Sequence, residues 1–202
     1  MQLNIDDFIK KSKTVDMIYL DSPNNPTGFQ FTRNYLKKLI QSFKGPIIID
    51  EAYVEFADSS VVSLVKQYDN LIVVRTLSKA FGLAGLRLGY FAANKKIVDA
   101  FSKIMQYPYP LNTLAIQCGI LALEKSKKIS PIFSLIKNER RKIIQNLRKT
   151  GAFDVFDSEA NFVLFDAKGA DSRVYNALIE QGISIRKLGK LGRHKGLSLI
   201  HI

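Results

Sequence analysis

Three short apolar segments of this sequence are each followed by a polar group with a different chemistry. The segment VDMIYL leads to an amide, Asn25; GPIIID ends in a carboxylate, Asp50; and NLIVVRT leads to an amine, Lys79. A lysine held in a confined pocket can form a Schiff base with an aldehyde. We therefore expect aldehyde chemistry at Lys79 if the fold brings these three groups together.

Pyridoxal phosphate is an aldehyde whose requirements this set of residues meets. Its pyridine nitrogen needs a carboxylate, here Asp50, which keeps the nitrogen protonated so that the ring can accept electrons from a bond broken at Cα. Its phenolic oxygen needs hydrogen-bond donors, for which Asn25 and Tyr53 are candidates. Its phosphate needs a cation and hydroxyl groups. The candidates for the phosphate are Thr76, Ser78 and Arg87.

Each of these groups also has a purely structural interpretation. The segment SPNNPTG (22–28) consists of residues that form turns. Asp50 and Glu51 could cap a helix or pair with a surface lysine, and Lys79 could be solvated. The cofactor hypothesis rests on the three loops together, because each of them places a chemically active group after a strand.

The elements that position these residues alternate between strands and helices. Near-continuous apolar runs separated by helices are typical of an α/β fold, here a mostly parallel, three-layer sheet covered on both faces. Ligands bind beyond the carboxyl ends of the strands in such sheets. The predicted strands are 15–20, 45–50, 70–76 and 86–93, and the predicted helices are 32–43, with Thr32 as its N-cap, and 59–68.

The second half of the chain predicts a small α+β domain. A long helical region, 113–149, carries inward apolar residues such as Ile144 and ends near Gly151. It is followed by the predicted strands FDVF, NFVLF and ISIRK, with the helix SRVYNALIEQ between the last two.

Composition and charge exclude several classes of protein. The 202 residues are 47% hydrophobic and 24% charged, as in ordinary globular proteins, and no apolar run is long enough to cross a bilayer. The net charge of +12 is concentrated in residues 101–150, where ten Lys and Arg face two acidic residues. We interpret this as a solvated helix face, since no nucleic-acid motif accompanies it.

Cysteine and glycine spacing exclude further sites. Cys118 is the only cysteine, which rules out an internal disulfide or a cysteine-based metal site and favours a cytoplasmic setting. Gly82, Gly85 and Gly89 follow the spacing G-x-x-G-x-x-x-G, which is not the dinucleotide-binding pattern.

Three motifs together resemble the successive signatures of class I/II aminotransferases of the fold-type I pyridoxal-phosphate superfamily. They are SPNNPTG, DEAYVEF and RTLSKAFGLAGLRLGY. Within that family the sequence is most similar to the histidinol-phosphate aminotransferase group, through RTLSKAFGLAGLRLG, YPYPLN and EANFVLF. The resemblance extends to about Gly196.

The resemblance implies a role for each site residue. Lys79 would bond to the cofactor and move a proton at Cα, Asp50 would pair with the ring nitrogen, and Asn25 and Tyr53 would contact the phenolic oxygen. Ser78 and Arg87 would hold the cofactor phosphate, with Thr76 as a weaker candidate. The implied substrate residues are Arg186, which would bind the substrate phosphate, and Tyr109 and Asn112, which would line the pocket; Asn161 would support its wall. Arg186 also has a structural interpretation, as an exposed arginine after a short strand.

The implied activity is transfer of an amino group between histidinol phosphate and 2-oxoglutarate or glutamate by a homodimer. Threonine-phosphate decarboxylase and aromatic aminotransferases remain alternatives within the family. A different class is a ligand-sensing, aminotransferase-like domain of a transcriptional regulator.

Compared with the family, the sequence lacks N-terminal strands, the phosphate-binding turn and the C-terminal arginine strand, so we expect a fragment with weak cofactor binding and little turnover. The expected organisation is a partial cofactor domain (1–112), a helical connection with a small domain (113–196) and a non-native tail (197–202). The tail LSLIHI is the translation of CTGTCTCTTATACACATC, which resembles a transposon end used in sequencing libraries; the alternative is a genuine alternating strand.

Overall fold

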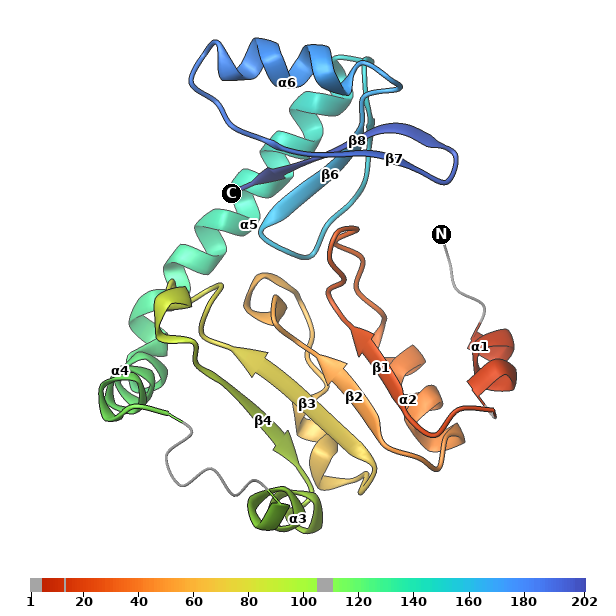
Figure 1. Ribbon diagram of the computed structural model, residues 1–202, viewed down its shortest axis with the longest axis vertical. Coiled ribbons are helices and arrows are strands. Elements are labelled where there is room, and N and C mark those ends of the chain that lie inside the picture. The colour runs from red at the N-terminus through yellow and green to blue at the C-terminus, as the bar shows by residue number, and fades with distance from the viewer. Residues whose placement is uncertain (1–4, 13, 105–110) are drawn as a thin grey trace. The chain divides into compact units, whose positions relative to one another are not determined.

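The computed structural model describes residues 5–12, 14–104 and 111–202 (Figure 1). Its contacts divide the chain into two compact units. The first contains Met1–Ser22 and Phe31–Ile129, and the second contains Pro23–Gln30 and Ser130–Ile202. Among the described residues, no helix is both long and apolar enough to cross a membrane.

The first unit is built on a mixed four-stranded sheet of order β1-β2-β3-β4. The three parallel strands end at one edge, because Asp21 lies opposite Asp50 and Asp50 lies opposite Val74. The ends of the three strands therefore share one edge of the sheet, as predicted. The strands are β1 (Ile18–Asp21), β2 (Ile47–Asp50), β3 (Leu71–Thr76) and β4 (Gly89–Ala93).

The fourth strand runs antiparallel to β3, with Thr76 opposite Gly89. A parallel pairing needs a crossover that returns the chain to the starting edge of the sheet. The connection 77–88 instead turns back directly and continues the pairing, since the Leu77 N–H donates to the Leu88 carbonyl at 3.1 Å.

One face of this sheet forms the core of the first unit. Inward side chains of β1–β3, such as Ile47, Ile49 and Leu71, pack against Leu39 of α2 and Leu64 of η2, and Figure 1 shows α2 behind the strands. The predicted cap of α2 is confirmed, because the Thr32 hydroxyl accepts from the Tyr35 N–H at 3.2 Å. The helices are α1 (Ile5–Ser12), α2 (Arg33–Ser42), α3 (Lys95–Ile104) and α4 (Thr113–Glu124), with short 3-10 turns η1 (Val54–Phe56), η2 (Val62–Lys66) and η3 (Ala84–Leu86).

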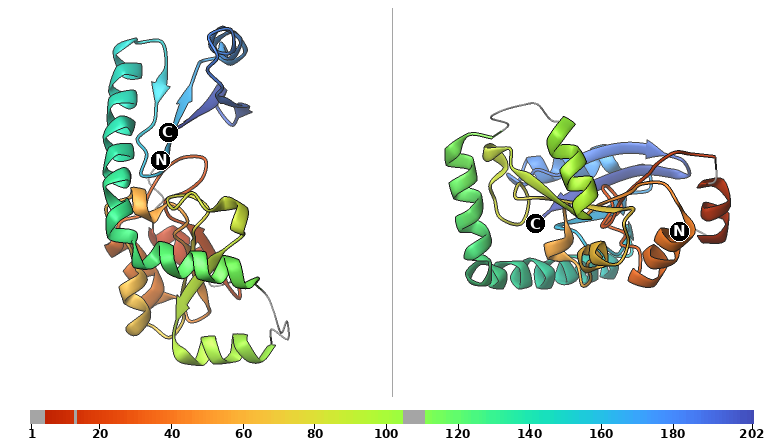
Figure 2. Two further views of the ribbon diagram at one scale, coloured as in Figure 1. Left: turned by 90° about the vertical axis from the view of Figure 1, so that its left-hand side faces the viewer. Right: turned by 90° about the horizontal axis from the view of Figure 1, so that it is seen from below.

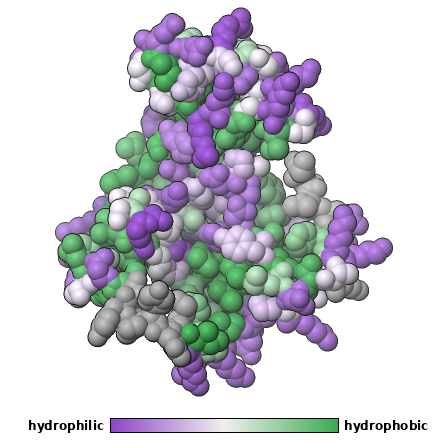
Figure 3. Space-filling view, viewed as in Figure 1, coloured by the Kyte–Doolittle hydropathy of each residue, from purple (hydrophilic) through white to green (hydrophobic). Residues whose placement is uncertain are grey.

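The other face of the sheet carries exposed side chains of β1 and its approach. Met17 is 52% and Tyr19 55% exposed. Figure 3 shows apolar surface on the side of this unit that faces the viewer. The apolar strands led us to expect a covering layer on this face as well. The described residues do not form such a layer over this part of the sheet.

The second unit contains an antiparallel sheet of order β5-β6-β8-β7. The predicted helical region 113–149 is confirmed and consists of two helices, α4 and α5, and Figure 2 shows α5 as one long helix beside the sheet. Apolar residues of α6, including Val174 and Leu178, pack on Phe165 of β6. The elements are α5 (Ser126–Lys149), β5 (Asp154–Val155), β6 (Phe162–Asp166), α6 (Asp171–Ile179), β7 (Arg186–Leu191) and β8 (His194–His201).

The C-terminal segment forms a strand in this sheet. β8 lies between β6 and β7, and Leu197 and Leu199 are fully buried. LSLIHI therefore lies in a strand, but burial does not alternate along it, because Ser198 between the two leucines is 0% exposed. The non-native origin of residues 197–202 and the domain boundary after residue 112 stay predictions.

The turn that contains Asn25 packs within the second unit. The Glu159 N–H donates to the Gly28 carbonyl at 2.7 Å. Gly28 has a φ of +70°, and a Cβ at this position would lie 2.2 Å from the Ser158 hydroxyl. Only glycine meets both requirements, which explains the last residue of SPNNPTG.

Because of the hydrogen bonds to Asp166, at the end of β6, we expect the stability of the second unit to fall in acid. Burial alone would raise its pKa, but the Lys168 N–H, the His194 ring and the Gly196 N–H bond to its carboxylate and hold the pKa below the ordinary 3.8. The stabilisation by this carboxylate is complete above that ordinary value and is lost as the pH falls through the lower, folded-state pKa. We expect Asp166→Asn to lower the free energy of unfolding at pH 7 by about 1.5–3 kcal/mol.

The measurement is urea unfolding followed by circular dichroism between pH 7 and pH 2. The variant should also lose less stability than the parent across the acid limb. Equal acid sensitivity of the two proteins would contradict this role of Asp166.

Candidate active site

Asp50 ends β2 at the edge where the three parallel strands finish. Its Oδ1 accepts from the Ala52 N–H at 2.9 Å, and its Oδ2 accepts from the Tyr19 hydroxyl at 2.5 Å. The side chain is partly buried. These two hydrogen bonds orient the carboxylate. Each carboxylate oxygen can accept more than one hydrogen bond, so Asp50 can still accept from a ligand.

The neighbouring carboxylate, Glu51, has a different role because successive strand residues point to opposite faces. Glu51 is 2% exposed, on the core face, and pairs with Arg75 at 2.7 Å. It also accepts from the Ser60 hydroxyl and from the Val61 N–H. The sequence interpretation of a cap or a surface lysine partner missed this pair. The alternation of Ile47, Ile49 and Glu51 on the core face was the available signal.

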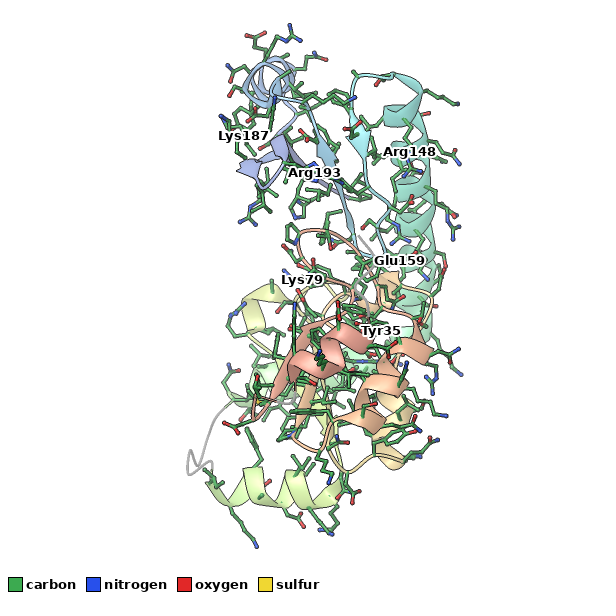
Figure 4. All side chains as sticks on the ribbon, turned by 90° about the vertical axis from the view of Figure 1, so that its right-hand side faces the viewer. Tyr35, Lys79, Arg148, Glu159, Lys187 and Arg193 are labelled. Atoms are coloured by element: carbon green, nitrogen blue, oxygen red, sulfur yellow. The ribbon has the colours of Figure 1, made fainter. Side chains whose placement is uncertain are left out.

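Lys79 lies beyond β3 on the turn toward β4, and Figure 4 labels it at the end of the first unit where the strands finish. Its side chain is exposed, and its Nζ lies 5.4 Å from the centre of the Tyr53 ring. Among the described residues it forms no salt bridge. The turn is held by the backbone, since the Leu83 N–H donates to the Leu77 carbonyl at 3.0 Å. An amine without an ion partner is available to an aldehyde.

Arg87 has a left-handed backbone with a φ of +52°, where glycine is the favoured residue. Its Nη1 donates to the Ala84 carbonyl at 3.1 Å. A long charged residue held in this conformation is the kind of backbone strain that accumulates at functional sites. The guanidinium is exposed and keeps further donors for an anion.

The hydroxyl of Thr76 is already used within the turn. It donates to the Leu88 carbonyl at 3.3 Å and accepts from the Ser78 N–H at 3.1 Å. Thr76 therefore orients the backbone that leads to Lys79. Ser78 is the better candidate of the two for a cofactor phosphate.

Two predicted site residues belong to the second unit. Asn25 is exposed on the turn that Gly28 and Glu159 hold. Arg186 is the first residue of β7 and is exposed opposite Leu199. The structure thus gathers Thr76, Ser78, Lys79, Arg87, Asp50 and Tyr53 on the first unit, and their relation to these two residues stays a prediction.

The remaining predicted residues have different settings. Asn112 caps α4, because its side chain accepts from the Ala115 N–H at 2.8 Å. Tyr109 lies outside the described residues. Asn161 precedes β6, and its buried side-chain oxygen has no hydrogen-bond partner among the residues that the structure describes.

The groups at the edge of the first sheet fit pyridoxal phosphate by their chemistry. Asp50 offers an oriented carboxylate, Lys79 an exposed amine, and Tyr53 a phenol beside that amine. Arg87 adds a cation for the phosphate. Sequence reasoning missed Tyr19, which lies on β1 and bonds to Asp50 on the neighbouring strand β2.

Comparison with known proteins gives the same assignment. A family profile described as "Aminotransferase class I and II" matches residues 1–194. A histidinol-phosphate aminotransferase from Thermoanaerobacter pseudethanolicus is 38% identical over 190 residues, which are 93% of this chain and 53% of that protein. The chain therefore spans about half the length of the curated relatives it matches.

Solved structures agree. The histidinol-phosphate aminotransferase from Clostridium acetobutylicum matches with a TM-score of 0.89 and 32% identity, covering 100% of this chain and 63% of that one. The enzyme of this name from Sinorhizobium meliloti, solved with pyridoxal-5'-phosphate, matches in fold with a TM-score of 0.83 at 24% identity, covering 98% of this chain and 56% of that one.

Proposed function

Because this chain belongs to the class I and II aminotransferase family, we propose that it carries the lysine-bearing part of a pyridoxal-phosphate enzyme that transfers an amino group between histidinol phosphate and 2-oxoglutarate or glutamate. The observation that carries the proposal is the edge of the first sheet, where the oriented carboxylate of Asp50 and the amine of Lys79 follow neighbouring parallel strands.

The bound cofactor would supply an electron sink for the bond broken at the substrate Cα. Lys79 would attach the cofactor and then carry the proton to and from that carbon. Asp50 would hold a proton on the ring nitrogen, and its contact with the Ala52 N–H keeps its oxygens in place. Tyr53 and Asn25 would donate to the phenolic oxygen, while Ser78 and Arg87 would hold the phosphate.

The substrate assignment rests on similarity and on Arg186. Arg186 and the pocket residues Tyr109 and Asn112 would recognise an amino phosphate, with the guanidinium on the phosphate. The names of the relatives favour histidinol phosphate. A cytoplasmic homodimer is part of the same proposal.

Asp50→Asn tests the role of the carboxylate. An amide cannot balance the charge of a protonated ring nitrogen, so we expect turnover to fall roughly 10²–10³-fold, the loss typical of one preorganised electrostatic contact. The reaction is followed as loss of the visible cofactor band after addition of histidinol phosphate. The matched control is Asp99→Asn on α3, which removes only an exposed pair with Lys95 and should leave the rate unchanged.

The substrate is tested in the same assay. If threonine phosphate releases CO₂ and histidinol phosphate leaves the band unchanged, the assignment changes from an aminotransferase to a decarboxylase. A rate unaffected by Asp50→Asn would remove Asp50 from the site.

A further inference from the structure

Tyr19 connects two strands at the edge of the first sheet. It lies on β1 opposite Ile48, so it is the diagonal neighbour of Asp50 on β2. A diagonal pair of this kind is within reach of a long aromatic side chain. The Tyr19 hydroxyl donates to Asp50 Oδ2 at 2.5 Å, a distance typical of a strong bond from a hydroxyl to a carboxylate.

The pair lies on the face of the sheet opposite the core. Ile18 of β1 and Ile49 of β2 point into the core, and strand alternation turns Tyr19 and Asp50 to the other side. Tyr19 is 55% exposed, so burial of a large apolar surface does not explain its position. Its hydroxyl donates a hydrogen bond to Asp50, the carboxylate that the proposed function assigns to the cofactor ring.

The two oxygens of Asp50 are thereby held from different directions. Oδ1 accepts from the Ala52 N–H of its own strand end, and Oδ2 accepts from Tyr19 of the neighbouring strand. Two donors on separate elements fix the plane of the carboxylate. They also share its negative charge, which leaves less of that charge for a third group.

We propose, resting on the function proposed above, that Tyr19 is a positioning residue that orients Asp50 and sets how much negative charge Asp50 presents to the cofactor ring. It touches neither substrate nor cofactor in this role. Its effect reaches the reaction through the carboxylate alone.

The charged groups around the hydroxyl are consistent with this role. Burial, the hydrogen bond to Asp50 and the charges of Asp50 and Asp21 all raise the pKa of Tyr19 above its ordinary value of 10.0. Tyr19 therefore stays a protonated donor across the neutral pH range, and Asp50 is the acceptor.

The contact is tested first in the chain without cofactor. With ¹³C-labelled tyrosine, the ring-carbon signal that disappears in Tyr19→Phe is assigned to Tyr19. We expect this signal to titrate above the ordinary tyrosine pKa of 10.0 in the parent and to move toward that value in Asp50→Asn. A Tyr19 signal that titrates alike in parent and Asp50→Asn overturns the proposal.

The effect on the cofactor is tested by the visible absorbance of the chain loaded with pyridoxal phosphate. The visible form of the bound cofactor is protonated, and Tyr19→Phe would leave more negative charge on Asp50, which would stabilise that form through the ring. We expect the pH midpoint of the band to rise by about 0.5–1 unit, the size of one hydrogen bond. Tyr68→Phe, which removes a hydroxyl that accepts from Gln41 at 3.0 Å in the same unit, should not move the midpoint.

The outcomes separate the two proposals. A band in the parent with the same midpoint in Tyr19→Phe overturns the role of Tyr19 and leaves the proposed function standing. A parent that forms no band even with a large excess of cofactor overturns the proposed function and, with it, the effect of Tyr19 on the cofactor ring; the titration without cofactor still decides whether Tyr19 bonds to Asp50. A midpoint that shifts equally in Tyr68→Phe shows a general loss of structure and also overturns the role of Tyr19.

Discussion

Lys79→Ala is expected to abolish attachment of pyridoxal phosphate to this chain. The parent should develop a visible band at about 400–430 nm with the cofactor, and borohydride reduction should leave the cofactor on the peptide that contains Lys79. The physical reason is the setting of the amine, which is exposed, lies beside the Tyr53 ring and has no salt-bridge partner among the described residues. Turnover should fall by roughly 10²–10⁴-fold from the lost proton transfer alone.

The control is Lys66→Ala, which removes another exposed lysine of the first unit, at the end of η2. It should keep the band and the site of reduction. Peptide mass spectrometry that finds the reduced cofactor spread over many surface lysines, and no less of it in Lys79→Ala, would refute the assignment of Lys79.

Glu51→Gln is expected to be the most destabilising of the substitutions considered for the first unit, by about 3–5 kcal/mol. Glu51 is 2% exposed and holds Arg75, whose side chain is 19% exposed. Burial alone would lower the pKa of Arg75, but Glu51 outweighs it and raises the pKa, so the guanidinium keeps its charge. Removing the carboxylate charge takes away the ion partner that is hydrogen-bonded to Arg75, and the Ser60 hydroxyl and Val61 N–H lose a charged acceptor.

The measurement is urea unfolding followed by circular dichroism, because the chain has no tryptophan to report by fluorescence. Asp99→Asn, which breaks an exposed pair with Lys95, should change stability by at most about 1 kcal/mol. Replacing both partners, with Glu51→Leu and Arg75→Met, should recover much of the loss. A single Glu51→Gln variant as stable as the parent would show that the pair contributes little.

Local pattern was enough to predict the strands and the residues that follow them. Apolar runs such as PIIID and NLIVV bury one face of a sheet whatever lies beyond them, so β2 and β3 fall within the predicted ranges. Thr32 caps α2 because a cap depends on residues three positions away. The motif residues Asp50 and Lys79 could be named for the same reason, since their positions follow from where neighbouring strands end.

Contacts between distant segments were decided only by the tertiary structure. The pairing of Tyr19 with Asp50 depends on the register of β1 on β2, and that of Glu51 with Arg75 on the register of β2 on β3. Register is set by packing across the whole sheet, and no local motif encodes it.

The sequence by itself determined the family and the α/β fold and predicted the residues that would bind an aldehyde cofactor, because these follow from residue types and their spacing. The tertiary structure decided that β4 runs antiparallel, that Asp50 faces Tyr19 and that Glu51 turns into the core. The physical reason is that side-chain direction and pairing partner depend on strands brought together from far apart in the chain.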